Sequence, residues 1–108
     1  MKKYDVIVTP YAEEQLEIIL HYISEKLLNY QTAIDIIDLI NSKKEILSLY
    51  PETYPLSDFK LWNKRKIRKI NVKSFIMYYY IDKAKLKVYI ISIVFMKRDK
   101  IEQFELYK

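Results

Sequence analysis

The 108-residue sequence predicts an α+β fold with the element order β-α-α-β-β-β. Three patterns indicate this class: residues 3–8 alternate like a strand, residues 10–49 contain two stretches with helical apolar spacing, and residues 66–96 are rich in β-branched and aromatic side chains. A chain of this length is expected to form one domain, spanning residues 1–108. We expect the two helices to pack as a hairpin on one face of a mainly antiparallel sheet.

The first half of the chain supplies the first strand and both helices. After the strand, Thr9 can cap a helix and Pro10 suits its first position. The apolar stripe of this helix is predicted to be Leu16, Ile19, Leu20, Ile23 and Leu27. After a break at residues 29–31, a second helix is predicted from Thr32 to Leu49, with a stripe of Ala33, Ile37, Ile40 and Leu47, widened by Ile36 and Ile46.

The second half of the chain supplies the remaining strands. Pro51 and Pro55 favour extended backbone before them, and residues 56–65 are predicted to be irregular. Strands are predicted at 66–73, 75–81 and 86–96, with a polar hairpin loop at 82–85. Because 75–81 is apolar or aromatic on both faces, we expect this strand to be central and covered on both sides.

Composition excludes several kinds of site. Without cysteine, disulfides and thiolate zinc sites are excluded, and without glycine, glycine-rich phosphate loops are excluded. The single histidine, His21, is expected on the exposed surface of the first helix, and multi-histidine metal sites are excluded. We therefore expect no cofactor and no metal. The sequence contains neither a signal-peptide pattern nor an apolar run of 18 residues, so we expect a cytoplasmic protein with no membrane partner.

The charge is divided between the two halves. Residues 1–54 carry 5 basic and 9 acidic side chains, a net −4, whereas residues 55–108 carry 14 basic and 5 acidic, a net +9. Residues 60–73 contain seven basic side chains and no acidic one. The basic residues are Lys60, Lys64, Arg65, Lys66, Arg68, Lys69 and Lys73. Such a field attracts phosphate or an acidic partner protein. The alternative is a solvated, lysine-rich surface.

Alternation along the strands separates the candidate residues into two faces. Arg68 is predicted to point with Ile70 and Val72, and Lys69 the other way. Arg68 is then either an anion contact or part of a structural ion pair. Likewise, Tyr78 and Tyr80 are predicted on the face opposite Tyr79, where they form either core or a stacking surface. At the end of the last strand, Lys97 and Arg98 either extend the basic patch or form a local pair with Asp99.

Several short motifs follow one another in a characteristic order. They are Val6-Ile-Val-Thr-Pro-Tyr-Ala12, Leu49-Tyr-Pro51, Arg68-x-Ile70-x-Val72, Phe75-Ile-Met-Tyr-Tyr79 and the closing strand that ends in Arg98-Asp99. This ordered set resembles the RelE/ParE superfamily, the toxin halves of type II toxin–antitoxin pairs. The resemblance implies a β-α-α-β-β-β, microbial-RNase-like fold, which agrees with the order derived from the residue patterns. It also implies a cognate antitoxin encoded nearby.

The resemblance leaves two branches, which differ in target. RelE-like members cut mRNA in the ribosome with basic residues and usually a C-terminal tyrosine or histidine, whereas ParE-like members poison DNA gyrase. The RelE arginine would fall at Ile76 and the family's frequent histidine at Phe95, so both groups are replaced here. The hairpin followed by Pro51 and Pro55 is closer to ParE.

The favoured prediction is a ParE-like toxin that arrests growth by binding a large target, DNA gyrase. Its predicted contact residues are Lys64, Arg65, Lys66, Arg68, Lys69, Lys97 and Arg98. One alternative is a RelE-like, metal-independent endoribonuclease acting on mRNA in the ribosome, with catalytic residues Arg68, Arg98 and Tyr107. The other alternative is a non-toxic partner-binding domain.

Overall fold

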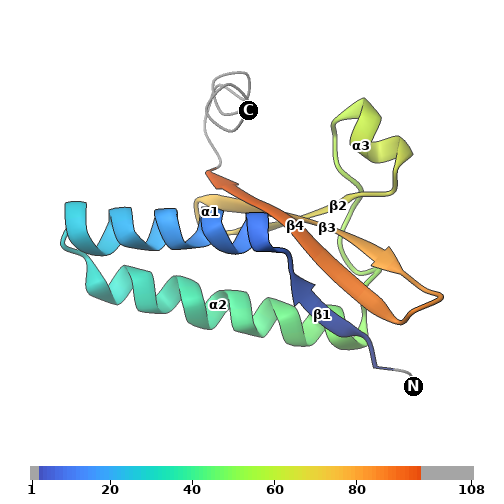
Figure 1. Ribbon diagram of the computed structural model, residues 1–108, viewed down its shortest axis with the longest axis horizontal. Coiled ribbons are helices and arrows are strands. Elements are labelled where there is room, and N and C mark those ends of the chain that lie inside the picture. Colours follow the sequence, from blue (N-terminus) through green and yellow to red (C-terminus); the bar gives the residue numbers. More distant parts are fainter. Residues whose placement is uncertain (1–2, 96–108) are drawn as a thin grey trace.

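The computed structural model describes residues 3–95. Its elements in chain order are β1 (Asp5–Val8), α1 (Pro10–His21), a π-helical turn η1 (Tyr22–Lys26), α2 (Tyr30–Leu49), α3 (Lys60–Lys64), β2 (Arg68–Val72), β3 (Phe75–Asp82) and β4 (Lys87–Phe95). The strands form one sheet in the order β1-β4-β3-β2. Helices α1 and α2 lie together on one side of this sheet, and α3 projects on the other (Figure 1). The predicted α+β class and the position of the helical hairpin are confirmed.

The sheet combines an antiparallel meander with one parallel strand. β2 pairs with β3 and β3 with β4 in antiparallel register, and β1 pairs in parallel with β4. Because β1 pairs only with residues 87–90, the rest of the β4 edge needs other partners. There the side chain of Gln15, on α1, accepts a hydrogen bond from the Ile93 amide at 2.8 Å. α1 therefore supplies a hydrogen-bond acceptor to this part of the β4 edge.

Capping residues determine where the helices begin. Thr9 Oγ1 accepts from the Ala12 amide at 3.3 Å, and Pro10 occupies the first turn of α1 as predicted. Asn29 caps α2 by accepting from the Thr32 amide at 3.1 Å. α2 therefore begins at Tyr30, two residues before the predicted start at Thr32.

The main core lies between the hairpin and the sheet. Its buried members are Ala12, Ile19, Ile23, Ala33, Ile36, Ile40, Leu47, Ile70, Val72, Phe75, Met77, Tyr79, Val88, Ile90 and Ile93. Of the other predicted stripe residues, Leu16 and Leu20 are partly buried against this core and Ile46 is partly buried, whereas Leu27 and Ile37 are exposed. α2 turns Ile36 rather than Ile37 toward the sheet, and Leu27 lies where the chain leaves η1.

The segment predicted to be irregular, residues 56–65, contains the short helix α3, so that prediction was wrong in part. Phe59 and Trp62 are three residues apart, which places both rings on the same side of this single helical turn. Their packing against Tyr78 stabilises the turn. The predicted strand at 66–73 begins only at Arg68, because Lys66 has a left-handed φ of 61° that interrupts extended backbone.

Candidate functional site

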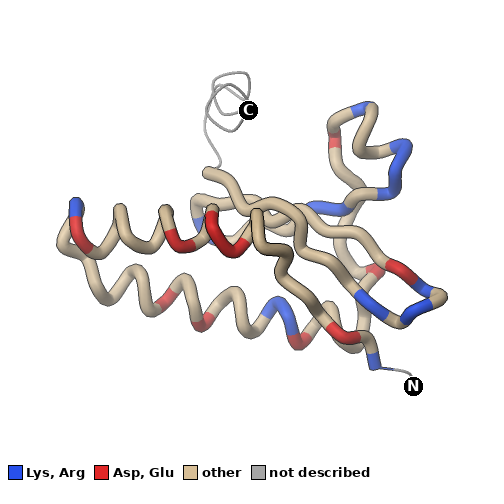
Figure 2. The backbone as a smooth tube through the Cα atoms, viewed as in Figure 1, with Lys and Arg blue, Asp and Glu red and all other residues tan. Residues whose placement is uncertain are grey.

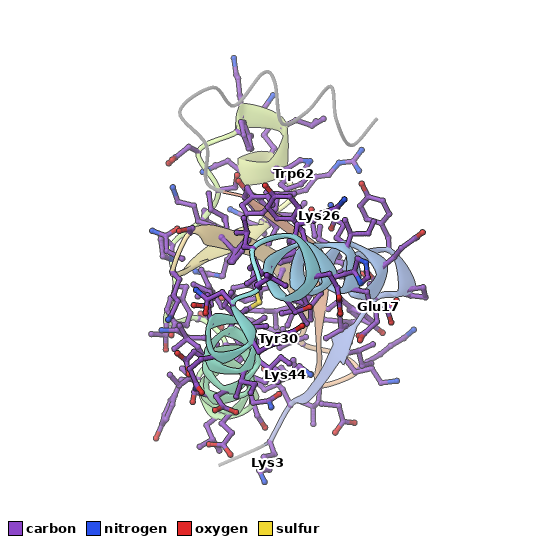
Figure 3. All side chains as sticks on the ribbon, turned by 90° about the vertical axis from the view of Figure 1, so that its left-hand side faces the viewer. Lys3, Glu17, Lys26, Tyr30, Lys44 and Trp62 are labelled. Carbon is purple, nitrogen blue, oxygen red and sulfur yellow. The ribbon has the colours of Figure 1, made fainter. Side chains whose placement is uncertain are left out.

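The sheet surface away from the hairpin, which we call the α3 face, carries a second, smaller apolar cluster. Its buried residues are Ile67, Ile76 and Tyr78, and partly buried Phe59, Trp62, Ile91 and Val94 pack against them. Trp62 meets the Tyr78 ring edge-on at a centroid distance of 4.7 Å. Figure 3, which labels Trp62, shows it at the base of α3, where the helix meets the sheet. Farther along this face, Tyr80 and Tyr89 stack at 5.1 Å.

Burial also changes the chemistry of this cluster. Desolvation, with the nearby Asp58 carboxylate as a second cause, raises the pKa of the Tyr78 hydroxyl above its ordinary value. Tyr78 therefore stays neutral at physiological pH and is poorly suited to act as a base.

Exposed cations surround the base of α3. Lys60, Lys64, Arg65 and Lys66 are all exposed and lie within one short segment, residues 60–66, which we call the basic turn. Lys69 lies next to it and pairs with Asp58. Figure 2 shows Lys and Arg gathered on α3, while acidic residues follow α1 and α2. The structure thus brings together the predicted residues Lys64, Arg65 and Lys66, with Lys69 beside them.

Arg68 lies on the other side of the sheet, as alternation predicted. Its Nη1 donates to the Tyr54 carbonyl at 2.7 Å, and its Nε is buried without a hydrogen-bond partner. Its cross-strand neighbour Tyr79 donates from its hydroxyl to the Pro51 carbonyl, also at 2.7 Å. Of the two roles open to Arg68, the structure shows a structural contact, to a backbone carbonyl rather than to a carboxylate.

The other cations of the second half are distributed elsewhere. Lys73 lies 3.9 Å from Asp35 of α2, and Lys83 pairs with Glu52 at 2.8 Å. The hydrogen bond to Lys83 and its charge lower the pKa of the Glu52 carboxyl, and the same contact raises the pKa of the Lys83 ammonium. The predicted residues Lys97, Arg98 and Tyr107 lie outside the described residues. Within residues 3–95, the predicted basic residues that lie together are gathered at the basic turn.

The positions at which the resemblance places RelE-like catalytic groups hold packed apolar side chains. Ile76 is buried in the cluster of the α3 face, and the Phe95 ring packs against Phe75 at 4.7 Å. His21 is exposed on α1, as expected. Within residues 3–95, no group of histidine, cysteine or carboxylate side chains is arranged to hold a metal ion. The described surface offers exposed charge at the basic turn and an apolar cluster beside it.

Two features of the surface were missed by sequence reasoning. Leu61, the second residue of the basic turn, is 61% exposed. On α2, Tyr30, Ile34 and Ile37 form an exposed row at helical spacing. The spacing of Phe59 and Trp62 was the available signal for the first feature, because it turns both aromatic rings inward and Leu61 outward.

A helical hairpin packed on a four-stranded sheet is the fold that the resemblance to the RelE/ParE superfamily implies. The sequence model of a family described as "ParE toxin of type II toxin-antitoxin system, parDE" matches residues 6–99. The chain belongs to this ParE toxin family, which confirms the resemblance found in its motifs.

The chain shares its fold with a solved structure. A chain of the chromosomal ParDE toxin–antitoxin system from P. aeruginosa superposes with a TM-score of 0.66 at 15% identity, covering 88% of this chain and 98% of that one. The isolated E. coli RelE toxin gives a TM-score of 0.47 at 13% identity, with 96% of each chain covered. A search of curated proteins found no match. Within residues 3–95, none of the helices is both long enough and apolar enough to span a bilayer.

Proposed function

We propose that this chain is the toxin of a type II toxin–antitoxin pair and that it arrests growth in the cytoplasm by binding DNA gyrase through the α3 face. The observation that carries the proposal is the ParE family match over residues 6–99. The basic turn supports it, because exposed Lys64, Arg65 and Lys66 offer charge for a large acidic target. Lys69 adjoins them, and Lys97 and Arg98 remain proposed contacts outside the described residues.

Packing on the two faces of the sheet favours binding over RNA cleavage. Cleavage through the 2′-hydroxyl needs a proton acceptor, a proton donor and positive charge at the phosphate. The basic turn offers charge, but Ile76 and Phe95 are packed among apolar side chains, and the pKa of Tyr78 is raised by burial. These three positions supply no group that could exchange a proton near neutral pH.

We also propose that the cognate antitoxin covers the exposed row on α2. Tyr30, Ile34 and Ile37 lie one turn apart and are exposed by 56%, 50% and 41%. Tyr30 is labelled in Figure 3, at the end of the hairpin that faces the viewer. An amphipathic segment can bury such a row with its own apolar face.

The target is tested by asking which process fails first after induction. Plasmid supercoiling and protein synthesis are followed in the same culture, and the purified chain is added to gyrase in a supercoiling assay. We expect supercoiling to fall before protein synthesis, and inhibition of the purified enzyme. Unchanged supercoiling with cuts in translated messages would instead identify a RelE-like nuclease. Normal growth at strong expression would identify a non-toxic binding domain.

A further inference from the structure

The basic turn places an exposed apolar side chain among its cations. Leu61 is 61% exposed, and its neighbours Lys60, Lys64 and Arg65 are exposed as well. Burying a leucine side chain is favourable, so a partner that covers Leu61 between these cations gains from its apolar area.

The turn is held in one conformation by contacts beneath it. Asn63 Nδ2 donates to the Ser57 carbonyl at 3.1 Å, and the Ser57 hydroxyl accepts from the Phe59 amide at 3.2 Å. Ser57 itself is buried, and its amide donates to the Ile67 carbonyl at 2.7 Å. The chain then closes the turn with a bond from the Ile67 amide to the Trp62 carbonyl at 2.9 Å. Leu61 therefore projects from a braced element rather than from an unsupported loop.

Bracing matters for binding, because a preorganised side chain loses less conformational freedom when a partner covers it. Phe59 and Trp62 use their rings on Tyr78, so the apolar contacts that hold α3 in place do not involve Leu61. Leu61 is not part of the apolar cluster that holds α3 on the sheet.

We infer that α3 is a docking element for an acidic protein surface, with Leu61 inserted into an apolar pocket and Lys64 and Arg65 on acidic side chains around it. The partner is the toxin's target, so the inference rests on the proposed function and names the surface that serves it. The antitoxin row on α2 belongs to the hairpin, on the opposite side of the sheet from α3 (Figure 1).

The composition of the turn favours a protein over a nucleic acid. Single-stranded nucleic acids are bound by aromatic side chains on which bases stack. The aromatic side chain inside the helix, Trp62, packs edge-on against Tyr78, and the outward residue is the aliphatic Leu61. An apolar anchor within a polar rim is typical of protein–protein contacts.

The test compares Leu61→Ser with Leu49→Ser, which changes another exposed leucine, at the end of α2. The readout is the inducer concentration that halves the growth rate of a bacterial host, together with the melting temperature of each purified variant. We expect Leu61→Ser to weaken the affinity for the target about 10- to 100-fold, as expected for losing a buried leucine contact, and to raise the inducer requirement accordingly. Its melting temperature should match the wild-type value, and Leu49→Ser should remain as toxic as the wild type.

Charge reversal, compared with loss of the leucine, distinguishes a protein partner from a nucleic acid. Lys64→Glu is compared with Lys85→Glu, an exposed lysine on the β3–β4 hairpin. We expect Lys64→Glu to reduce growth arrest as Leu61→Ser does, and Lys85→Glu to leave it unchanged. Loss of arrest in Lys64→Glu with full arrest in Leu61→Ser would overturn the inference, because it indicates a purely electrostatic contact such as nucleic acid. Full arrest in both would overturn it as well.

These experiments distinguish an error in the identity of the target from an error in the role of α3. Growth arrest does not depend on which protein is bound, so a toxic chain that leaves purified gyrase active contradicts gyrase while still testing Leu61. A wild-type chain that does not arrest growth contradicts the proposed function and, with it, this inference. Arrest by the wild type with equal arrest by Leu61→Ser contradicts the docking element alone.

Discussion

Arg68 and Tyr79 face each other across β2 and β3, and each donates a hydrogen bond to a carbonyl of the connector, residues 50–59, between α2 and α3. The acceptors are Tyr54 for Arg68 and Pro51 for Tyr79, both at 2.7 Å. The Lys69 amide adds a bond to the Pro55 carbonyl at 3.0 Å. The sheet thereby fixes the path of the chain from the hairpin to the basic turn.

The first prediction concerns Arg68. Arg68→Met keeps much of the side chain's length but removes the donor to Tyr54, and a hydrogen bond from a charged group contributes about 1.5–3 kcal/mol. We expect the free energy of unfolding in urea to fall by about that amount. Arg65→Met, at an exposed position, should change it by less than about 0.5 kcal/mol. Equal stability of Arg68→Met and the wild type would contradict the structural role.

The second prediction concerns the pH dependence of Tyr79. Burial raises the pKa of its hydroxyl above the ordinary value, and the Arg68 charge opposes this only in part. A pKa raised in the folded state contributes stability that is complete below the unfolded pKa, about 10, and is lost as the pH rises toward the folded pKa. The wild type should therefore lose stability above about pH 10 because of this group.

Tyr79→Phe tests that statement. At pH 7 it leaves the buried Pro51 carbonyl without its donor, which should cost about 1–3 kcal/mol. Above about pH 10 the difference from the wild type should shrink, because the variant has no hydroxyl to ionise. Free energies of unfolding from pH 7 to pH 11 provide the measurement, with the pH 7 difference as reference. Parallel curves over the whole range would contradict the prediction.

The third prediction concerns a left-handed residue in a chain without glycine. Leu28 has φ 50° just after η1 and is 71% exposed, so its side chain gains little from packing. Leu28→Gly should raise the free energy of unfolding by about 0.5–1 kcal/mol, because glycine adopts positive φ without a steric penalty. The matched control is Leu27→Gly, where φ is −92°. It should lower stability by about 0.5–1 kcal/mol, and the opposite order in thermal unfolding would refute the explanation.

The fourth prediction concerns Gln15 at the open edge of β4. Gln15→Leu keeps the size of the side chain but leaves the buried Ile93 amide without an acceptor, which should cost about 1–3 kcal/mol. Hydrogen exchange of the Ile93 amide should accelerate. Gln31→Leu removes an exposed hydrogen bond to Asp35 and should change stability by less than about 0.5 kcal/mol. Unchanged exchange at Ile93 in Gln15→Leu would count against the edge contact.

Periodic patterns in the sequence were enough to predict the longer helices and strands. Alternation placed Ile70 and Val72 on the core face of β2 and Lys69 on the other, and Thr9 and Pro10 fixed the start of α1. These signals are local, because they depend on backbone period and on caps within a few residues. The exposed row on α2 was missed for a related reason: residues 36 and 37 are both isoleucine, and composition alone does not tell which faces the sheet.

The sequence by itself determined the element order, the paired helices, the acidic and basic halves, and the exclusion of thiolate sites and glycine loops. Only the tertiary structure decided that Arg68 binds the connector, that Phe59 and Trp62 fold residues 60–64 onto Tyr78, and that Leu61 stays outside. The physical reason is distance along the chain. Tyr54 precedes Arg68 by 14 residues, and Tyr78 follows Trp62 by 16, so these contacts depend on how the folded sheet brings remote segments together.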